Sequence, residues 1–311
     1  MTKQDLRIVF MGTPEFAVES LRALVEGGYN VVAAVTMPDK PAGRGHHMIT
    51  SAVKDYALSV GIPVLQPERL KAPEFLAELA ALNAELFIVV AFRMLPEVVW
   101  SMPRLGTFNL HGSLLPRYRG AAPINWAVIN GDTETGVTTF FLQHEIDTGD
   151  LILQERIPIG EDENVVSVHD RLMVVGAGLV IRTVDLIIDS ENTGKPVPTT
   201  PQEKILLSAG QLPAEALGAP KIFKETCEID LTKTALEVKN FVRGLSPYPA
   251  AWTNLHVGDH VFENTKIFEV QIVDRPTPLC LKAADGYLDI LSLQVPGKKR
   301  LNAKDFLNGL K

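Results

Sequence analysis

The sequence predicts an α/β fold: a Rossmann-like, mostly parallel sheet followed by a small, OB-like antiparallel β-barrel. In residues 1–190, short runs of β-branched and aromatic residues alternate with segments of helical periodicity, as in successive βα units. Residues 86–92 are apolar throughout, which is typical of a parallel strand buried on both faces. From residue 221 on, short alternating strands dominate. We therefore expect two domains, 1–190 and 221–311, joined by a proline- and glycine-rich linker at 191–220.

The first domain begins with a strand, a turn and a helix. We expect its strands at residues 6–11, 31–36, 63–65, 86–92, 107–111, 135–143 and 151–159, and its helices at residues 16–24, 51–60, 73–82, 96–102 and 165–190. The turn after the first strand contains a single glycine, Gly12, so the Gly-x-Gly-x-x-Gly fingerprint of dinucleotide-binding proteins is missing. A nicotinamide cofactor is therefore not expected.

The second domain has one predicted helix, at residues 234–243. Its strands are expected at residues 252–257, 266–273, 279–282 and 288–294. The stretch after the last of these strands is strongly basic, with Lys298, Lys299 and Arg300 in succession. Such a cluster is usually a solvated turn, although it would also suit a phosphate backbone.

Composition points to a globular protein without a membrane-spanning segment. The chain has 311 residues, of which 46% are hydrophobic and 22% are charged, and a net charge of −7. Because the acidic excess lies before residue 221, a polyanionic partner would have to bind at local basic patches. We find no apolar run of membrane-spanning length and no signal peptide, so we expect a cytoplasmic protein. Cys227 and Cys280 lack the spacing of metal ligands, and we expect both to be reduced packing residues.

One predicted strand, residues 107–111, ends in polar groups and enters a loop rich in glycine and proline. Side chains alternate along a strand, so Asn109 and His111 fall on one face while Phe108 and Leu110 fall on the other. The ends of strands in α/β folds are where such proteins place their chemistry. A histidine at such a place is, however, more often a satisfied structural residue, so this pair alone leaves both interpretations open.

Two polar loops are further candidates. Residues 37–48 hold Lys40, Arg44, His46 and His47 in a long loop, which is either functional or a solvated surface segment. The two histidines lack the spacing and the carboxylate neighbours of a metal site, so no metal is expected there. Residues 144–150 place three carboxylates around a glycine, which is most often only a solvated hairpin turn.

Taken together, these motifs resemble the methionyl-tRNA formyltransferase family. The resemblance rests on the Met-Gly-Thr-Pro-Glu-Phe start, the Pro-Ala-Gly-Arg-Gly loop at 41–45, Asn109 and His111 with the Ser-Leu-Leu-Pro-Arg-Tyr-Arg-Gly-Ala-Ala-Pro-Ile segment at 113–124, the Asp-Thr-Gly-Asp turn at 147–150, and the C-terminal barrel. It covers nearly the whole chain. It implies a formyltransferase core and transfer of the formyl group of 10-formyltetrahydrofolate to the α-amino group of methionyl initiator tRNA, by a monomer and without a metal.

The resemblance also implies roles for individual residues. The catalytic positions would be Asn109, His111 and Asp147. The folate pocket would be lined by Phe92, Met94, Leu95, Ser113, Leu114, Leu115 and Pro116. The tRNA would contact Lys40 and Arg44 in the first loop and Lys298, Lys299 and Arg300 in the second domain.

The expected chemistry agrees with the pattern of residues. An amine that attacks a formyl carbon builds negative charge on the formyl oxygen, which an Asn109 amide and a protonated His111 could stabilise from one strand face. Asp147 could hold the His111 imidazolium and accept the proton of the amine. The alternatives are a folate-dependent formyltransferase that acts on a nucleotide or sugar-nucleotide amine, and a catalytically silent tRNA-binding protein.

Overall fold

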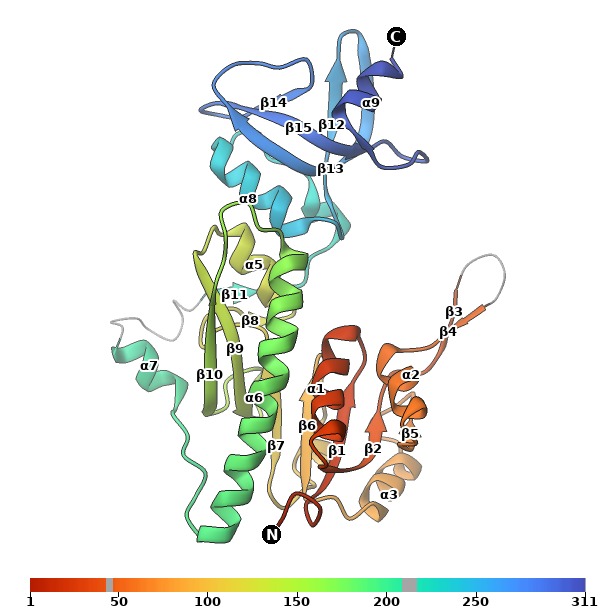
Figure 1. The fold of residues 1–311 in the computed structure, drawn as a ribbon, viewed down its shortest axis with the longest axis vertical. Coiled ribbons are helices and arrows are strands. Elements are labelled where there is room, and N and C mark those ends of the chain that lie inside the picture. Colours follow the sequence, from red (N-terminus) through yellow and green to blue (C-terminus); the bar gives the residue numbers. More distant parts are fainter. Residues whose placement is uncertain (43–46, 209–216, 311) are drawn as a thin grey trace. The chain divides into compact units, whose positions relative to one another are not determined.

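The computed structural model describes residues 1–42, 47–208 and 217–310, shown as a ribbon in Figure 1. The chain forms two compact units. The first contains residues 1–119, 136–156 and 170–217, and the second contains residues 120–135, 157–169 and 218–311. This contact-based division does not follow the predicted boundaries at residues 190 and 220, which stay a prediction.

The first unit is built on a seven-stranded sheet with the order β10-β9-β7-β6-β1-β2-β5. The pairs β1–β2, β1–β6, β2–β5 and β6–β7 are parallel, whereas β7 and β9 are antiparallel. The mostly parallel sheet is therefore confirmed. The strands span Arg7–Gly12 (β1), Asn30–Val35 (β2), Val64–Leu65 (β5), Leu86–Val90 (β6), Thr107–His111 (β7), Glu134–Phe141 (β9) and Leu151–Pro158 (β10).

Helices cover both faces of this sheet. One face is lined by alternate apolar residues of β1, β2 and β6, such as Met11 and Val89, which pack in one cluster with Phe75 and Leu79 of α3 and Val99 of α4. In Figure 1, α1 and α6 lie in front of the opposite face. The helices span Glu15–Glu26 (α1), Ala52–Ser59 (α2), Pro73–Ala81 (α3), Glu97–Trp100 (α4), Val165–Thr193 (α6) and Gln202–Ser208 (α7), whereas α5 (Pro123–Ile129) belongs to the second unit.

A glycine of α6 lets the helix lie close against β7. An ideal Cβ at Gly176 would come within 2.8 Å of Leu110 Cδ2, and Leu110 is buried. Phe108 is fully buried as well. The apolar side chains of β7 therefore face the α6 side of the sheet, which leaves Asn109 and His111 on the other face.

The second unit contains a five-stranded antiparallel sheet with the order β12-β13-β15-β14, in which β16 also pairs with β15. Its core is made of alternate strand residues such as Leu255, Ile267 and Leu288, packed with Val238 and Val242 of α8. The elements span Ala235–Leu245 (α8), Ala251–Val257 (β12), His260–Val273 (β13), Cys280–Lys282 (β14), Tyr287–Gln294 (β15), Leu301–Asn302 (β16) and Ala303–Asn308 (α9). The predicted C-terminal antiparallel domain is confirmed.

Several short elements differ from the sequence-based prediction. The predicted loop at residues 37–48 forms an antiparallel hairpin of β3 (Lys40–Ala42) and β4 (His47–Ile49), while Arg44 and His46 lie outside the described residues. The predicted linker contains α7 and the short strand β11 (Gly218–Ala219). The short strand β8 (Arg119–Gly120), a 3₁₀ turn at Lys224–Cys227 and α9 were not predicted, because each is too short to show a periodic pattern.

No helix in the described part of the chain is long and apolar enough to cross a membrane.

Glycine substitutions test the close packing of the second unit. We expect Gly244→Ala to lower the free energy of unfolding by about 1–3 kcal/mol, because its Cβ would lie 2.5 Å from Ile129 Cγ1 and 2.9 Å from the Ile129 amide nitrogen. Gly178→Ala in α6 is the matched control. Its Cβ meets nothing within 4 Å, so this change should raise stability by about 0.5–1 kcal/mol. Denaturant unfolding of both variants measures the change in the free energy of unfolding. A Gly244→Ala variant more stable than the wild type would contradict this packing.

Candidate active site

The candidate site lies along β7. This strand pairs in parallel with β6, where Val89 is opposite Asn109, and in antiparallel with β9, where Thr138 is opposite His111. Flanking strands on both sides hold the strand straight and fix its register. Asn109 and His111 therefore project from one face of a rigid strand, as predicted.

The ring of His111 is buried and has two different neighbours. Its Nε2 lies 2.8 Å from the carbonyl oxygen of Tyr118. Because a carbonyl only accepts, Nε2 carries a hydrogen and donates it. The other ring nitrogen, Nδ1, lies 3.9 Å from Oδ2 of Asp147, and Phe140 contacts the ring edge-on. The polar partners thus orient the ring so that Nδ1 is the nitrogen on the Asp147 side.

The amide of Asn109 is incompletely satisfied. Its Oδ1 is buried and has no hydrogen-bond partner among the described residues. Rotating the amide by half a turn would place a nitrogen there, with its hydrogens equally unpaired. A buried polar atom without a protein partner is costly, and in native proteins it is explained by strain, a catalytic role or a bound water or ion.

Asp147 comes from the loop between β9 and β10. Its side chain is only 11% exposed, and its φ is 55°, in the left-handed region that residues other than glycine rarely adopt. The side-chain nitrogen Nε2 of Gln202 donates to the backbone carbonyl oxygens of Asp147 and Gly149, each at 2.8 Å. The strained loop is therefore held from α7.

Two further residues near the site share this backbone conformation. Ala91, directly after β6, has a φ of 47°, and Tyr118, whose carbonyl binds His111, has a φ of 62°. Such conformations persist where the surrounding structure enforces them, and they cluster at functional sites.

The predicted wall at residues 113–116 is tied to β9. Thr138 Oγ1 donates to the Ser113 carbonyl at 2.6 Å and accepts from the Leu115 amide at 3.2 Å and from Gln154 Nε2 at 2.9 Å. Leu115 packs with Phe140 in a small core cluster. The segment is thus rigid next to His111, while its predicted contact with a folate stays a prediction for Ser113, Leu114, Leu115 and Pro116.

The other predicted folate residues follow β6. Leu95 is buried in the α3–α4 cluster, with Phe92 packed partly against it, whereas Met94 is 72% exposed. Arg93 donates to the carbonyls of Pro67 and Glu68, which fixes the course of the loop. Leu95 therefore packs in the core, whereas Phe92 and Met94 have more exposed surface, and the predicted contact of all three with a folate stays a prediction.

The basic residues predicted to contact tRNA lie in both units. Lys40 is exposed on β3 of the first unit. In the second unit, Lys298 and Lys299 are exposed, whereas Arg300 donates to Ser292 Oγ at 2.7 Å and lies over the Phe268 ring at 4.3 Å. Arg300 therefore has a packing role in addition to its charge.

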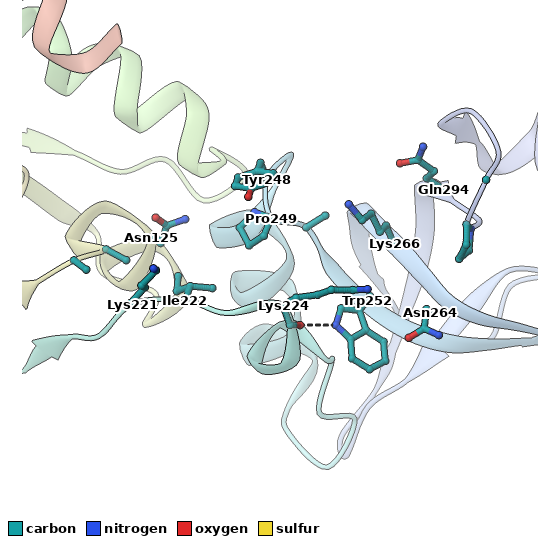
Figure 2. A pocket seen from close by; sticks show the side chains of 15 residues that line it. Asn125, Lys221, Ile222, Lys224, Tyr248, Pro249, Trp252, Asn264, Lys266 and Gln294 are labelled. Atoms are coloured by element: carbon teal, nitrogen blue, oxygen red, sulfur yellow. Dashed lines mark hydrogen bonds between the residues drawn. The ribbon is translucent and has the colours of Figure 1, made fainter. Parts of the chain in front are cut away.

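A pocket of about 640 Å³ lies in the second unit (Figure 2). Its lining residues come from the start of α5 at 121–125, from 221–224, from 248–252, from β13, and from the turn at 294–297 that precedes Lys298. Lys221, Lys224 and Lys266 are its charged side chains, and no described residue that lines it is acidic.

Strand register explains how this pocket gathers its side chains. Lys266 of β13 pairs with Trp252 of β12 on one side and with Gln294 of β15 on the other, so the three side chains form a row on one face. The Trp252 indole donates to the Lys224 carbonyl at 2.8 Å, drawn as a dashed line in Figure 2. Tyr248, labelled in the same view, is 81% exposed. Cations, aromatic rings and amides therefore line one open surface.

Known families account for both parts of this chain. A family model described as "Formyl transferase" matches residues 6–184, and one described as "Formyl transferase, C-terminal domain" matches residues 221–311. The chain belongs to the formyl transferase family. The resemblance predicted from the motifs is confirmed.

The formyl transferase is similar to curated relatives over its whole length. It is 58% identical over 325 residues to "Methionyl-tRNA formyltransferase" of Parabacteroides distasonis, an alignment that covers 100% of this chain and 98% of the relative. It is 56% identical over 322 residues to the protein of the same name from Bacteroides fragilis, covering 99% and 96%.

A solved structure shares the fold of the formyl transferase. It is described as WlaRD, a sugar 3N-formyl transferase, in the presence of dTDP and 5-N-formyl-THF. The TM-score is 0.65 at 19% identity, with 94% of this chain and 99% of that chain covered.

Some features of the site in this formyl transferase were not predicted. Gln202 falls in the predicted linker at residues 191–220. Arg119 lies in the segment at residues 113–124 that carries the family resemblance, but no role was predicted for it. A glutamine after a proline carries no periodic or motif signal, so only its buried hydrogen bonds identify it. In the described residues, no group of three or more His, Cys, Asp or Glu side chains could hold a metal ion.

Thr138 tests whether the wall beside His111 depends on one hydroxyl. We expect Thr138→Val to lower the free energy of unfolding by about 1–3 kcal/mol, because the buried Leu115 amide and Ser113 carbonyl lose their partner. Thr138→Ser keeps the hydroxyl and should cost less. Urea unfolding compares the two variants, and equal losses would mean that the methyl group, not the hydroxyl, stabilises the wall.

Proposed function

We propose that this formyl transferase transfers the formyl group of 10-formyltetrahydrofolate to the α-amino group of methionine on initiator tRNA, giving formylmethionyl-tRNA for translation initiation. The observation that carries the proposal is the placement of the Asn109 amide on the same strand face as His111, with Asp147 facing that ring. Full-length relatives with that enzyme name support the choice of substrate. We expect the enzyme to act in the cytoplasm as a monomer and without a metal.

The hydrogen bonds of His111 decide which of its nitrogens can act. Nε2 already donates to the Tyr118 carbonyl, so only Nδ1 can reach a substrate atom. For Nδ1 also to donate, the ring must be the doubly protonated imidazolium. The Asp147 carboxylate lies 3.9 Å from this nitrogen.

The three side chains then divide the work of acyl transfer. The folate supplies the formyl group. The Asn109 amide and the His111 Nδ1–H donate to the formyl oxygen as the attack of the amine places negative charge on it. Asp147 accepts the proton of the amine, directly or through a water molecule. The bond between the formyl carbon and N10 of the folate then breaks, and the leaving nitrogen takes up a proton, so that tetrahydrofolate is released.

The folate contacts of Phe92, Met94, Leu95 and residues 113–116 remain part of this proposal. The buried position of Leu95 and Leu115 favours a role in shaping the pocket wall rather than in touching the folate. The resemblance of the fold to a structure described with 5-N-formyl-THF is compatible with a folate donor in this family.

Asn109, His111 and Asp147 are the residues to test first. We expect Asn109→Ala and His111→Ala each to lower kcat by about a hundredfold or more, since each removes one donor to the oxyanion. Asp147→Asn keeps the shape of the side chain, and asparagine tolerates the positive φ of this position. A loss of kcat in this variant would therefore show that the negative charge of Asp147 is needed.

The assay uses purified protein with methionyl initiator tRNA and 10-formyltetrahydrofolate, and detects acid-stable formylmethionine. Thermal unfolding of each variant controls for folding. Full activity of Asn109→Ala or His111→Ala would refute the assignment. Formylation of an amino-sugar nucleotide in place of the tRNA would favour the alternative substrate, and the absence of any transfer would favour a silent tRNA-binding protein.

The pocket of the second unit supports the tRNA part of the proposal. Its three lysines would neutralise phosphates, and Tyr248 and Trp252 offer faces on which unpaired bases could stack. The predicted contacts at Lys298, Lys299 and Arg300 adjoin it, because Pro296 and Gly297 of the same turn line the pocket. Lys40 and Arg44 remain the proposed contacts in the first unit.

Charge reversal tests this pocket. We expect Lys224→Glu and Lys266→Glu to raise KM for the tRNA, to flatten its salt dependence and to leave KM for the folate unchanged, because phosphate contacts release counterions. Lys304→Glu on α9 makes the same change of charge in the same unit at an exposed position outside the pocket. Initial rates at several salt concentrations are the measurement. If Lys304→Glu had the same effect as the pocket variants, the effect would reflect net charge rather than a site.

A further inference from the structure

Gln202 is a buried amide at the first residue of α7, with 2% of its surface exposed. Its Nε2 donates to the carbonyl oxygens of Asp147 and Gly149, both at 2.8 Å. One side chain thus binds two carbonyls of the loop that carries the proposed proton acceptor. Because the Asp147 backbone is in the left-handed region, these bonds stabilise a conformation that few residues other than glycine, asparagine and aspartate adopt.

The other end of the same amide binds a cation. Oε1 of Gln202 accepts from Arg119 Nε at 3.0 Å and from Arg119 Nη2 at 2.6 Å. The amide can take only this orientation, since a rotated amide would set its oxygen against two carbonyls and its hydrogens against a guanidinium. The oxygen of the Gln202 side chain therefore always faces Arg119, and its nitrogen always faces the carbonyls of Asp147 and Gly149.

Arg119 connects this amide to the other half of the site. It follows Tyr118, whose carbonyl accepts from His111 Nε2 at 2.8 Å. Burial lowers the pKa of Arg119, and the nearby Asp147 carboxylate acts in the opposite direction. Fixing the Arg119 side chain therefore also fixes the backbone that orients the His111 ring.

We infer that Gln202 is a positioning residue for the formyl transfer. Through Nε2 it sets the Asp147 loop, and through Oε1 and Arg119 it sets the Tyr118 carbonyl that orients His111. A single amide thereby fixes the relative position of the imidazole and the carboxylate, which lie 3.9 Å apart. This inference rests on the proposed function for its kinetic test, and it makes α7 part of the active-site support rather than part of a linker.

Two variants separate the halves of this role. Gln202→Leu removes both sets of hydrogen bonds. Gln202→Glu keeps an acceptor for Arg119 but places a carboxylate oxygen against the carbonyls of Asp147 and Gly149, so it disturbs only the loop. We expect both variants to lower kcat about ten- to hundredfold while KM for the folate and for the tRNA changes less than about threefold. Ser208→Ala, at the exposed end of α7, should match the wild type.

A double-mutant cycle distinguishes positioning from general stability. In an Asp147→Asn background, Gln202→Leu should lower kcat by a smaller factor than it does in the wild type, because one of the two groups that it positions has already lost its charge. The ring-nitrogen NMR signals of His111 should shift in Gln202→Leu at unchanged temperature and pH. This second readout needs no turnover, so it tests the inference even if the enzyme uses another amine substrate.

The outcomes are distinguishable. Wild-type kcat in Gln202→Leu and Gln202→Glu, with unchanged His111 signals, would overturn the inference and leave the proposed function intact. Losses that multiply fully with Asp147→Asn would overturn the part of the inference that concerns the Asp147 loop, since they would show that Gln202 and Asp147 act independently. A wild-type protein that formylates no methionyl-tRNA, but whose His111 signals respond to Gln202→Leu, would overturn the proposed function and support the positioning role.

Discussion

The candidate site depends on the register of one strand. β7 is paired on both edges, in parallel with β6 and in antiparallel with β9. This pairing fixes which of its alternating side chains point to each face of the sheet. Leu110 meets Gly176 of α6 on one face, which leaves Asn109 and His111 to the other. A slip by one residue would bury the polar pair under α6 and expose the apolar pair. The packing that stabilises the sheet therefore also selects which side chains are available for chemistry.

Local patterns were sufficient to predict most of this arrangement. Strand β7 spans the predicted residues 107–111, and the mostly parallel sheet and the C-terminal antiparallel sheet both follow from hydrophobic periodicity. The position of Asp147 beside His111 could not come from periodicity, because α5 and β9 separate the two residues along the chain and Asp147 lies in a loop with a positive φ. The family resemblance supplied that pair, and the structure brings it together.

What the sequence did not reveal has a common physical reason. Gln202, Arg119 and the hairpin of β3 and β4 belong to segments too short for periodicity. The roles of Gln202 and Arg119 come from hydrogen bonds across long chain separations. The row of Trp252, Lys266 and Gln294 is similar, since it exists only when three strands are placed in register. Contacts of this kind are properties of tertiary structure, so residue types and spacing alone do not disclose them.

The unpaired amide of Asn109 has a consequence for the energetics of the resting protein. A buried polar atom without a partner raises the free energy of the folded state relative to a fully satisfied interior. Any ligand that supplies the missing partner removes this cost and binds only the folded chain, so occupancy and resistance to unfolding are thermodynamically linked. The Oδ1 atom of Asn109 thus couples the binding of a hydrogen-bond donor at this strand to the stability of the fold.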